Sequence, residues 1–281
     1  MLFEIRHLTR YRYSSPVRLG PQWLRFYPRV DSLQHVLDHR IDTLPNPVGR
    51  NLHLDLEGNR VTQLWFEGRT DRFEIDVTMQ VRTLDYNAYD FILLPEAMRL
   101  PILHAADDGL SKAYLQRSDQ DQTVTAFARE LARSADQDTL RFLERLNRRL
   151  FTEFERVIRD RGAPQSPAVT LQSRRGACRD LSVLFVDCCR SLGIPARFAS
   201  GYQKGDGRRT RRYLHAWPEV YLAGAGWRAY DPTHGKIVTD THVTLAAAAH
   251  PRDTMPVTGG FYGDEVSSRL DFELEIRLSE T

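Results

Sequence analysis

Cysteine is scarce in this chain and is not arranged as a scaffold. The 281 residues contain three cysteines, Cys178, Cys188 and Cys189. An odd number without framework spacing argues against a disulfide-stapled fold, and without a CxxC pair we do not expect a structural zinc site. Free thiols persist in a reducing compartment. The cysteines are therefore candidates for packing or for thiol chemistry, not for cross-linking.

Long apolar runs are also missing. No window holds the ~18 consecutive apolar residues that a membrane helix needs. The N-terminal stretch MLFEIRHLTRYRYS has neither the apolar centre nor the small-residue cleavage site of a signal peptide. We therefore predict a cytoplasmic protein that does not enter a membrane.

A large excess of one charge is absent as well. The chain has 39 basic and 37 acidic residues and a formal net charge of +2, which gives no reason to expect nucleic acid or an anionic membrane as partner. The local exception is a basic run, Arg208, Arg209, Arg211 and Arg212. We expect this run to be a solvated loop; the alternative is a mobile flap that attracts acidic substrates.

The first part of the chain is rich in predicted strands. Residues 61–66 and 73–81 alternate apolar and polar side chains with the period of two that is typical of half-buried strands. Turn signals punctuate this region, and one of them, Glu57-Gly58-Asn59, precedes the first run. No catalytic spacing occurs here, so we predict a β-sandwich-like accessory domain over residues 1–95.

The pattern then changes, and we assign residues 96–281 to a catalytic domain. Residues 123–134 and 138–154 carry apolar side chains at helical spacing, and Asp136 or Asp138 is the expected N-cap of the second helix. A mixed domain that begins with helices is therefore predicted.

Two further signals complete this coarse assignment. Pro164 and Pro167 predict a loop after the second helix. Residues 270–278 alternate strictly and predict a half-exposed strand at the end of the chain. The resulting fold class is α+β.

Cys178 occupies a position that suits a reactive thiol. Apolar residues at helical spacing predict a helix over residues 178–192, closed by Gly193 and Pro195. A cysteine in the first helical turn lies among unpaired N–H groups and at the positive end of the helix dipole, which favours the nucleophilic thiolate. Cys188 and Cys189 lie in the middle of the helix and are predicted to be buried packing residues.

A thiol nucleophile needs a base, and the base needs a group that orients it. His215 begins one predicted strand and Asp231 ends the next, so a hairpin brings the imidazole and the carboxylate together. The other histidines are interpreted as structural or exposed, because no acid is evidently paired with them. The candidate site is therefore Cys178, His215 and Asp231.

The length of the hairpin loop decides whether His215 and Asp231 point to the same face of the sheet. With a four-residue loop over residues 223–226, Leu222 would pair with Trp227, and His215 and Asp231 would point to opposite faces of the sheet. We predict a bulge or an odd-length loop between His215 and Asp231. Pro218 is a candidate for such an irregularity, because it cannot donate to a strand ladder.

Several motifs together resemble the transglutaminase-like superfamily. They are residues 176–180 (GACRD), 191–197 (SLGIPAR), 200–202 (SGY), 215–221 (HAWPEVY) and 226–233 (GWRAYDPT). Residues 253–263 (DTMPVTGGFYG) and the leading β region are similar to the bacterial branch, with its bacterial transglutaminase-like N-terminal region. Proline at position 218 departs from the family pattern, which has a small or β-branched residue there.

The resemblance implies a papain-like core in which a helix bearing Cys178 packs on an antiparallel sheet bearing His215 and Asp231. It also implies a mechanism in which the Cys178 thiolate attacks an amide or ester carbonyl. His215 would protonate the leaving group, and Asp231 would hold its productive tautomer. The backbone N–H of Cys178 is one candidate donor to the oxyanion; a second donor is left open.

Two neighbours of the candidate site have open roles. Trp217 is expected to share the His215 face of its strand, where it either walls the site or packs in the core. Asp180 falls in the first turn of the predicted helix, where it either satisfies the helix start or holds a nearby arginine.

Several functions remain compatible with these residues. Hydrolysis of a peptide or protein amide bond is favoured over transfer to an amine, because no calcium loop or secretion signal suggests extracellular cross-linking. A non-catalytic binding or scaffold protein is a further alternative. A metal site built from His215, Asp231 and His234 lacks a recognisable ligand spacing, and we expect no cofactor. The substrate and the oligomeric state are left open.

Overall fold

The computed structural model describes residues 1–279 except residues 32, 105–111, 119, 160 and 206–211. Arg208, Arg209 and Arg211 of the basic run lie outside the described residues. Among the helices that these residues form, none is long and apolar enough to cross a membrane.

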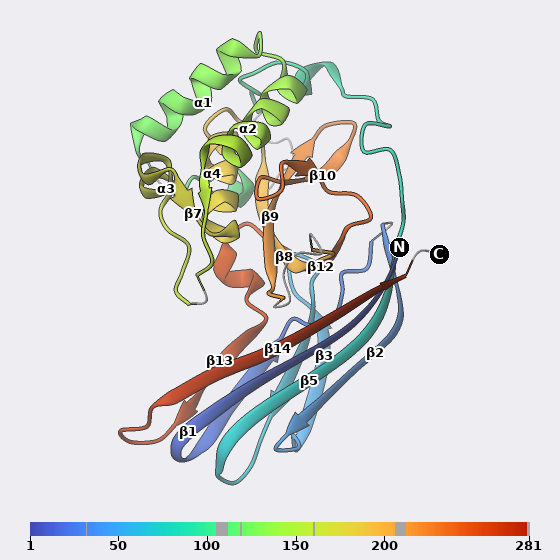
Figure 1. Cartoon of the computed structure of the whole chain (residues 1–281), viewed down its shortest axis with the longest axis vertical. Helices are drawn as coiled ribbons and strands as arrows, with labels where there is room; N and C mark the ends of the chain where they lie inside the picture. Colours follow the sequence, from blue (N-terminus) through green and yellow to red (C-terminus); the bar gives the residue numbers. More distant parts are fainter. Residues whose placement is uncertain (32, 105–111, 119, 160, 206–211, 280–281) are drawn as a thin grey trace.

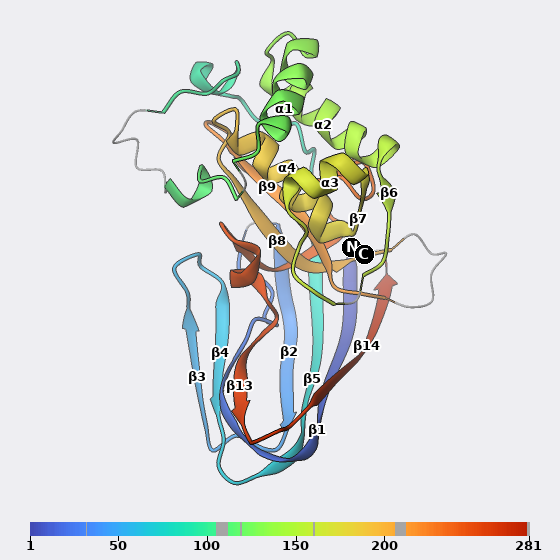
Figure 2. The same cartoon turned by 90° about the vertical axis from the view of Figure 1, so that its left-hand side faces the viewer.

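The N-terminal region is a sandwich of two antiparallel sheets that share one strand (Figures 1 and 2). Strand β1 pairs with β5 and β14 along its first part and with β4 and β13 along its last part. Strand β2 adds to β5, and β3 adds to β4. The strands are β1 (Leu2–Leu24), β2 (Gln34–Leu44), β3 (Gly49–Leu54), β4 (Arg60–Trp65), β5 (Thr70–Thr83), β13 (Val257–Tyr262) and β14 (Ser268–Ser279).

Alternation along the strands explains this core. The buried residues of β5 occupy every second position from Phe73 to Val81, so one face of the strand points into the sandwich and the other towards solvent. The sandwich-like accessory region, and the strands predicted at residues 61–66 and 73–81, are therefore confirmed.

Strands β13 and β14 correct the predicted division of the chain. Both pair with β1, and Leu2 lies opposite Ser279, so the last strands belong to the N-terminal sandwich. The sequence-based division had placed them with residues 96–281. The alternation of residues 270–278 predicts a strand but carries no information about its partner, which is more than 250 residues away in the sequence.

The second sheet carries the candidate site. Its antiparallel order within the described part of the chain is β11-β10-β9-β8-β12, so β12 forms one edge. The strands are β8 (Ala196–Gln203), β9 (His215–Leu222), β10 (Gly226–Asp231), β11 (Lys236–Ile237) and β12 (His242–Ala248). Two short strands, β6 (Glu155–Arg156) and β7 (Arg175–Gly176), pair separately.

Helices cover one side of this second sheet (Figure 1). They are α1 (Gln122–Ser134), α2 (Thr139–Glu153), α3 (Pro167–Ser173) and α4 (Cys178–Arg190). Helix α4 lies against β8 and β9, and its buried apolar residues share one core with those of α1 and α2. Asp138 caps α2 by accepting a hydrogen bond from Arg141 N at 2.8 Å, as one of the two predicted caps.

The loop predicted after the second helix is confirmed at Pro164, but helix α3 corrects the prediction at Pro167. Pro167 is the first residue of this short helix, and the Ser166 side chain accepts a hydrogen bond from Val169 N at 3.3 Å. Proline is tolerated there because the first helical N–H groups lack an acceptor within the helix. Pro167 therefore begins a helix.

Candidate active site

The start of α4 is built around the Asp180 carboxylate. Its Oδ2 accepts a hydrogen bond from Ala177 N at 2.8 Å, and its Oδ1 accepts one from Gln165 N at 2.8 Å. Arg159 also contacts Oδ1. Asp180 therefore fills both predicted roles, since it satisfies the helix start and holds an arginine. These bonds fix the turn from which Cys178 emerges.

The three cysteines differ in exposure as predicted. Cys178 is partly exposed at the first position of α4, whereas Cys188 and Cys189 are fully buried. Burial raises the pKa of Cys188 and of Cys189 above the ordinary value of a thiol. The two mid-helix cysteines are therefore inert packing residues, and Cys178 is the accessible thiol.

The loop between β9 and β10 has an odd number of residues, as predicted. Gly226 pairs with Leu222, and Ala229 pairs with Glu219, so residues 223–225 form a three-residue loop. Continuing this register places Asp231 opposite Trp217, on the face of the sheet that also carries His215. No bulge at Pro218 is needed.

The loop relies on glycines with positive φ. Gly224 has φ +91° and Gly226 has φ +76°, a region that side chains with a Cβ rarely enter. A Cβ on Gly224 would also lie 2.3 Å from Ile92 O. The sequence Ala223-Gly-Ala-Gly226 is therefore matched to the tight turn that sets the register.

His215 connects the other two predicted residues. Its Nε2 lies 2.9 Å from Asp231 Oδ2, and because a carboxylate can only accept, the imidazole donates at this nitrogen. The Cys178 thiol lies beside His215, whose hydrogen bonding and charge lower the thiol pKa, and Nδ1 is the ring nitrogen that Asp231 leaves available. The structure thus brings together Cys178, His215 and Asp231.

The electrostatics of the pair favour charge separation. Burial opposes ionisation of Cys178, but the hydrogen bond and charge of His215 and the N–H of Ala216 outweigh burial, so the thiol pKa lies below its ordinary value. Burial also lowers the pKa of His215, yet Asp231 and Cys178 together raise it well above normal. Both pKa shifts favour a thiolate beside an imidazolium.

Two histidines that the sequence left without a paired acid also contact Asp231. His234 Nδ1 lies 2.7 Å and His242 Nε2 lies 3.0 Å from the same Oδ2 that receives His215. The prediction that the other histidines lack such an acid is therefore wrong for these two. His234 follows Asp231 by three residues, which is a usable signal, whereas His242 reaches Asp231 from another strand, β12.

Asp231 is strongly held as an anion. Burial alone would raise its pKa, but the charge of His215 and the hydrogen bonds from the three histidines keep the pKa well below its ordinary range. Its Oδ1 accepts a further bond from Thr233 N at 2.9 Å. A carboxylate with so many donors is fixed in position and cannot easily rotate away from His215.

The comparisons with known proteins place this geometry in a family. A model of the bacterial transglutaminase-like N-terminal region matches residues 3–82, and a model of the transglutaminase-like superfamily matches residues 125–232, which include Cys178, His215 and Asp231. The chain belongs to the transglutaminase-like superfamily.

Relatives of this transglutaminase-like chain are found among curated proteins. An uncharacterized protein of Mycobacterium leprae is 26% identical over 283 residues, 97% of each chain. The protein-glutamine gamma-glutamyltransferase of Pseudomonas aeruginosa is 35% identical over 69 residues, which cover 22% of this chain and 10% of that protein.

A solved structure shares the whole fold. A protein of Cytophaga hutchinsonii, described as a candidate cysteine protease, superposes with a TM-score of 0.73 and 21% identity over 100% of this chain and 92% of that one. The predicted fold class, an α+β chain with a sandwich and a transglutaminase-like core, is therefore confirmed.

Trp217 packs against the imidazoles of the transglutaminase-like site. Its ring stacks on His215 with centroids 6.0 Å apart and meets the edge of His242 at 4.9 Å. Trp217 shares the His215 face, as predicted, and it is fully buried. It therefore supports the imidazoles from within the core and does not present a wall to substrate.

The same residues could hold a metal ion by their spacing alone. His215, Asp231 and His234 each offer one ligand atom, and these atoms lie within 4.8 Å of one another. Hydrogen bonding accounts for the same arrangement, because the nitrogen that each imidazole turns to Asp231 lies at donor distance from one carboxylate oxygen. The residues fit a hydrogen-bonded network around Asp231, and a metal centre stays an alternative.

Proposed function

We propose that this transglutaminase-like protein is a cysteine hydrolase that cleaves amide bonds of peptides or proteins. The observation that carries the proposal is the contact of a partly exposed thiol with an imidazole whose far nitrogen is held by a buried carboxylate. This arrangement supplies the nucleophile, the base and the orienting group that covalent catalysis needs.

The first half-reaction forms an acyl-enzyme. The Cys178 thiolate adds to the amide carbonyl carbon, and the carbonyl oxygen becomes an oxyanion. The backbone N–H of Cys178, which has no acceptor in the first helical turn, is available to stabilise that charge. When the oxyanion collapses, the C–N bond breaks, and the His215 imidazolium gives its Nδ1 proton to the leaving amine.

The second half-reaction releases the acid. His215, now neutral, takes a proton from water as the water oxygen adds to the thioester carbon. Collapse breaks the C–S bond and restores the thiolate and the imidazolium. Asp231 keeps the Nε2–H tautomer of His215 throughout and stabilises its charged form. One amide and one water thus yield one acid and one amine.

Transfer of the acyl group to an amine is the second candidate. The likeness to the protein-glutamine gamma-glutamyltransferase over 69 residues favours it, and the same catalytic residues serve both reactions. Acceptor choice depends on whether an amine reaches the thioester before water does. Purified protein should therefore be screened against peptide and amide libraries with and without an amine, and the product masses measured.

The outcomes separate the candidates. An acid and an amine whose masses add up to that of the substrate plus one water support hydrolysis, and amide products that contain the added amine support transfer. A protein that modifies no amide and whose Cys178 reacts with iodoacetamide no faster than a model thiol would be a binding or scaffold protein. A cytoplasmic location is proposed from the free cysteines, and cell fractionation tests it.

A further inference from the structure

Strand β12 links the N-terminal sandwich to the candidate site. Its first residue, His242, contacts Asp231, and its free edge faces the sandwich. We infer that the sandwich acts as a clamp on β12 that positions His242 against Asp231, and that His242 in turn keeps Asp231 oriented towards His215. This inference rests on the proposed function of the Cys178–His215 pair.

His242 is suited to hold the Asp231 carboxylate through a hydrogen bond. It is buried, and burial lowers its pKa, so the ring is neutral near neutral pH and carries one N–H. That N–H is on Nε2, 3.0 Å from Asp231 Oδ2, because a carboxylate accepts only. Its Nδ1 lies 2.9 Å from the Thr241 hydroxyl, which can donate to it. Both nitrogens are engaged, and the ring rests on Trp217.

The free edge of β12 presents backbone groups that need partners. In an antiparallel pair, alternate residues turn their N–H and C=O away from the neighbouring strand. β12 has one extra residue at Leu245, because Thr244 lies opposite Gly201 whereas Ala246 lies opposite Ser200. Such a bulge shifts by one residue the positions whose backbone N–H and C=O turn away from β8. These outward positions are therefore Thr244 and then Ala247.

The sandwich supplies a side-chain amide at each outward position. Gln34 accepts from Thr244 N at 2.9 Å and donates to Thr244 O at 2.8 Å. Asn59 accepts from Ala247 N at 2.9 Å and donates to Ala247 O at 3.0 Å. Each amide makes the pair of bonds that a further strand would make, and the spacing of the two contacts follows the bulge.

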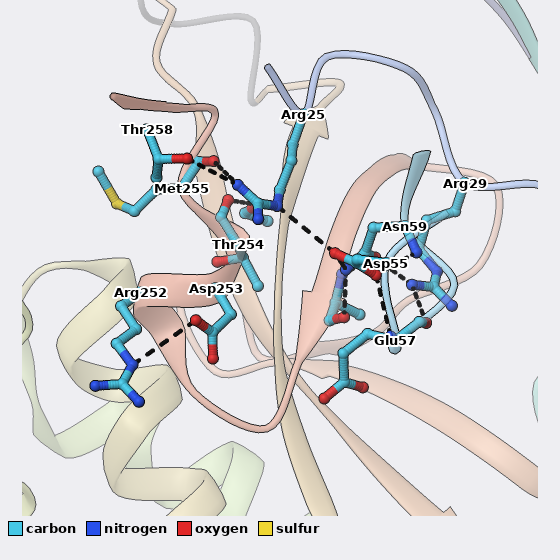
Figure 3. A network of polar contacts seen from close by, with 12 residues as sticks. Arg25, Arg29, Asp55, Glu57, Asn59, Arg252, Asp253, Thr254, Met255 and Thr258 are labelled. Carbon is cyan, nitrogen blue, oxygen red and sulfur yellow. Dashed lines mark hydrogen bonds and ion pairs between the residues drawn. The ribbon is translucent and has the colours of Figure 1, made fainter. Parts of the chain in front are cut away.

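The turn that carries Asn59 is itself braced (Figure 3). The Asp55 side chain accepts from Asn59 N at 2.9 Å and lies 3.7 Å from Arg25. Arg25 also donates to Thr258 at 3.2 Å. Glu57, on the same turn, accepts a hydrogen bond at 3.2 Å from the N–H of Ala249, the residue that directly follows β12. The clamp is therefore a connected set of contacts, and a sandwich side chain meets Thr244, Ala247 and Ala249.

Full-length single and double variants test the inference through alkylation of Cys178 by iodoacetamide at pH 7. His242→Leu removes the donor to Asp231 and should slow alkylation roughly tenfold, because an imidazole that loses its orienter stabilises the thiolate less. His242→Gln keeps a donor at a similar reach and should recover most of the rate. A purely structural role for the ring would predict no such rescue.

Gln34→Met tests the clamp, and Gln22→Met is its matched control. Both glutamines are 5% exposed, but the Gln22 side chain donates to Gly20 O and Gly260 O, both within the sandwich, whereas that of Gln34 bonds to β12. Gln34→Met should slow alkylation several-fold in the wild type, and Gln22→Met should not. If Gln34→Met does not fold, Gln34→Glu replaces it, since Glu keeps the acceptor but lacks the donor to Thr244 O.

The double variant decides the connection. If the clamp acts through His242, Gln34→Met should add little further slowing to His242→Leu. Rates that multiply in the double variant, or a His242→Leu chain that alkylates like the wild type, would overturn the inference. A wild type that cleaves no amide would refute hydrolysis but not the clamp, because alkylation reports on the thiolate without any substrate.

Discussion

The proposed ion pair of Cys178 and His215 predicts how the reactivity of the thiol changes with pH. The perturbations are pH itself and the substitution His215→Ala. In the wild type, His215 outweighs burial and lowers the thiol pKa below the ordinary 9.0, while the imidazolium keeps its proton up to a pKa of about 10. The ion pair should therefore persist across neutral pH, and the alkylation rate should be flat there and change as His215 loses its proton near pH 10.

The size of the His215→Ala effect follows from the thiolate fraction. A thiol with the ordinary pKa of 9.0 is only about 1% ionised at pH 7. Without His215, burial is the dominant influence on Cys178 and holds the pKa at or above that value. The thiolate fraction of the wild type is at most one, and that of His215→Ala is about 1% or less. The loss of thiolate alone can therefore slow alkylation by up to about a hundredfold at pH 7.

The assay is pseudo-first-order labelling with iodoacetamide, followed by mass spectrometry of the modified peptides. Cys188 and Cys189 are internal controls, because both are fully buried and should remain unlabelled in the folded protein. Cys178→Ser identifies the labelled site. A wild-type rate that rises smoothly to pH 9 like a free thiol, or that equals the His215→Ala rate at pH 7, would refute the ion pair.

Three further substitutions test the supports of the site. Asp231→Asn should lower the free energy of unfolding in urea at pH 7 by about 3–5 kcal/mol, because the buried imidazoles of His215 and His242 and the partly buried one of His234 lose their anion. The pKa of Asp231 is depressed in the folded protein, so this stabilisation is present above the unfolded pKa, and the difference from the wild type should shrink in acid. Asp180→Asn should cost about 1–3 kcal/mol by leaving the start of α4 poorly bonded, and an unchanged urea midpoint would contradict that role. Gly224→Ala should lower the free energy of unfolding by about 1–3 kcal/mol, because residue 224 has a positive φ and its Cβ would approach Ile92 O. Gly260→Ala is the control and should be far milder, because a Cβ there meets no atom within 4 Å. Equal melting temperatures for the two variants would argue against strain in the turn.

Local sequence signals were sufficient for much of the site. The helix that begins at Cys178 follows from apolar spacing with a glycine and a proline at its end, and the hairpin follows from two strand patterns around a glycine-rich loop. The need for His215 and Asp231 to share a face required an odd loop or a bulge, and the three-residue loop confirms that reasoning. These features depend on residues within about twenty positions of each other, where spacing constrains geometry directly.

Only the tertiary structure decided which distant segments meet. The strand pattern of residues 270–278 was evident, yet its pairing with β1 was not, because alternation specifies a buried face and not a partner. The contact of His242 with Asp231 was not evident from the sequence either, since β8 and β9 lie between their two strands in the sheet. The sequence by itself thus determined the thiol, the base, the acid and their order along the chain, and the packing of separate strands decided that His242 and the sandwich hold the acid in place.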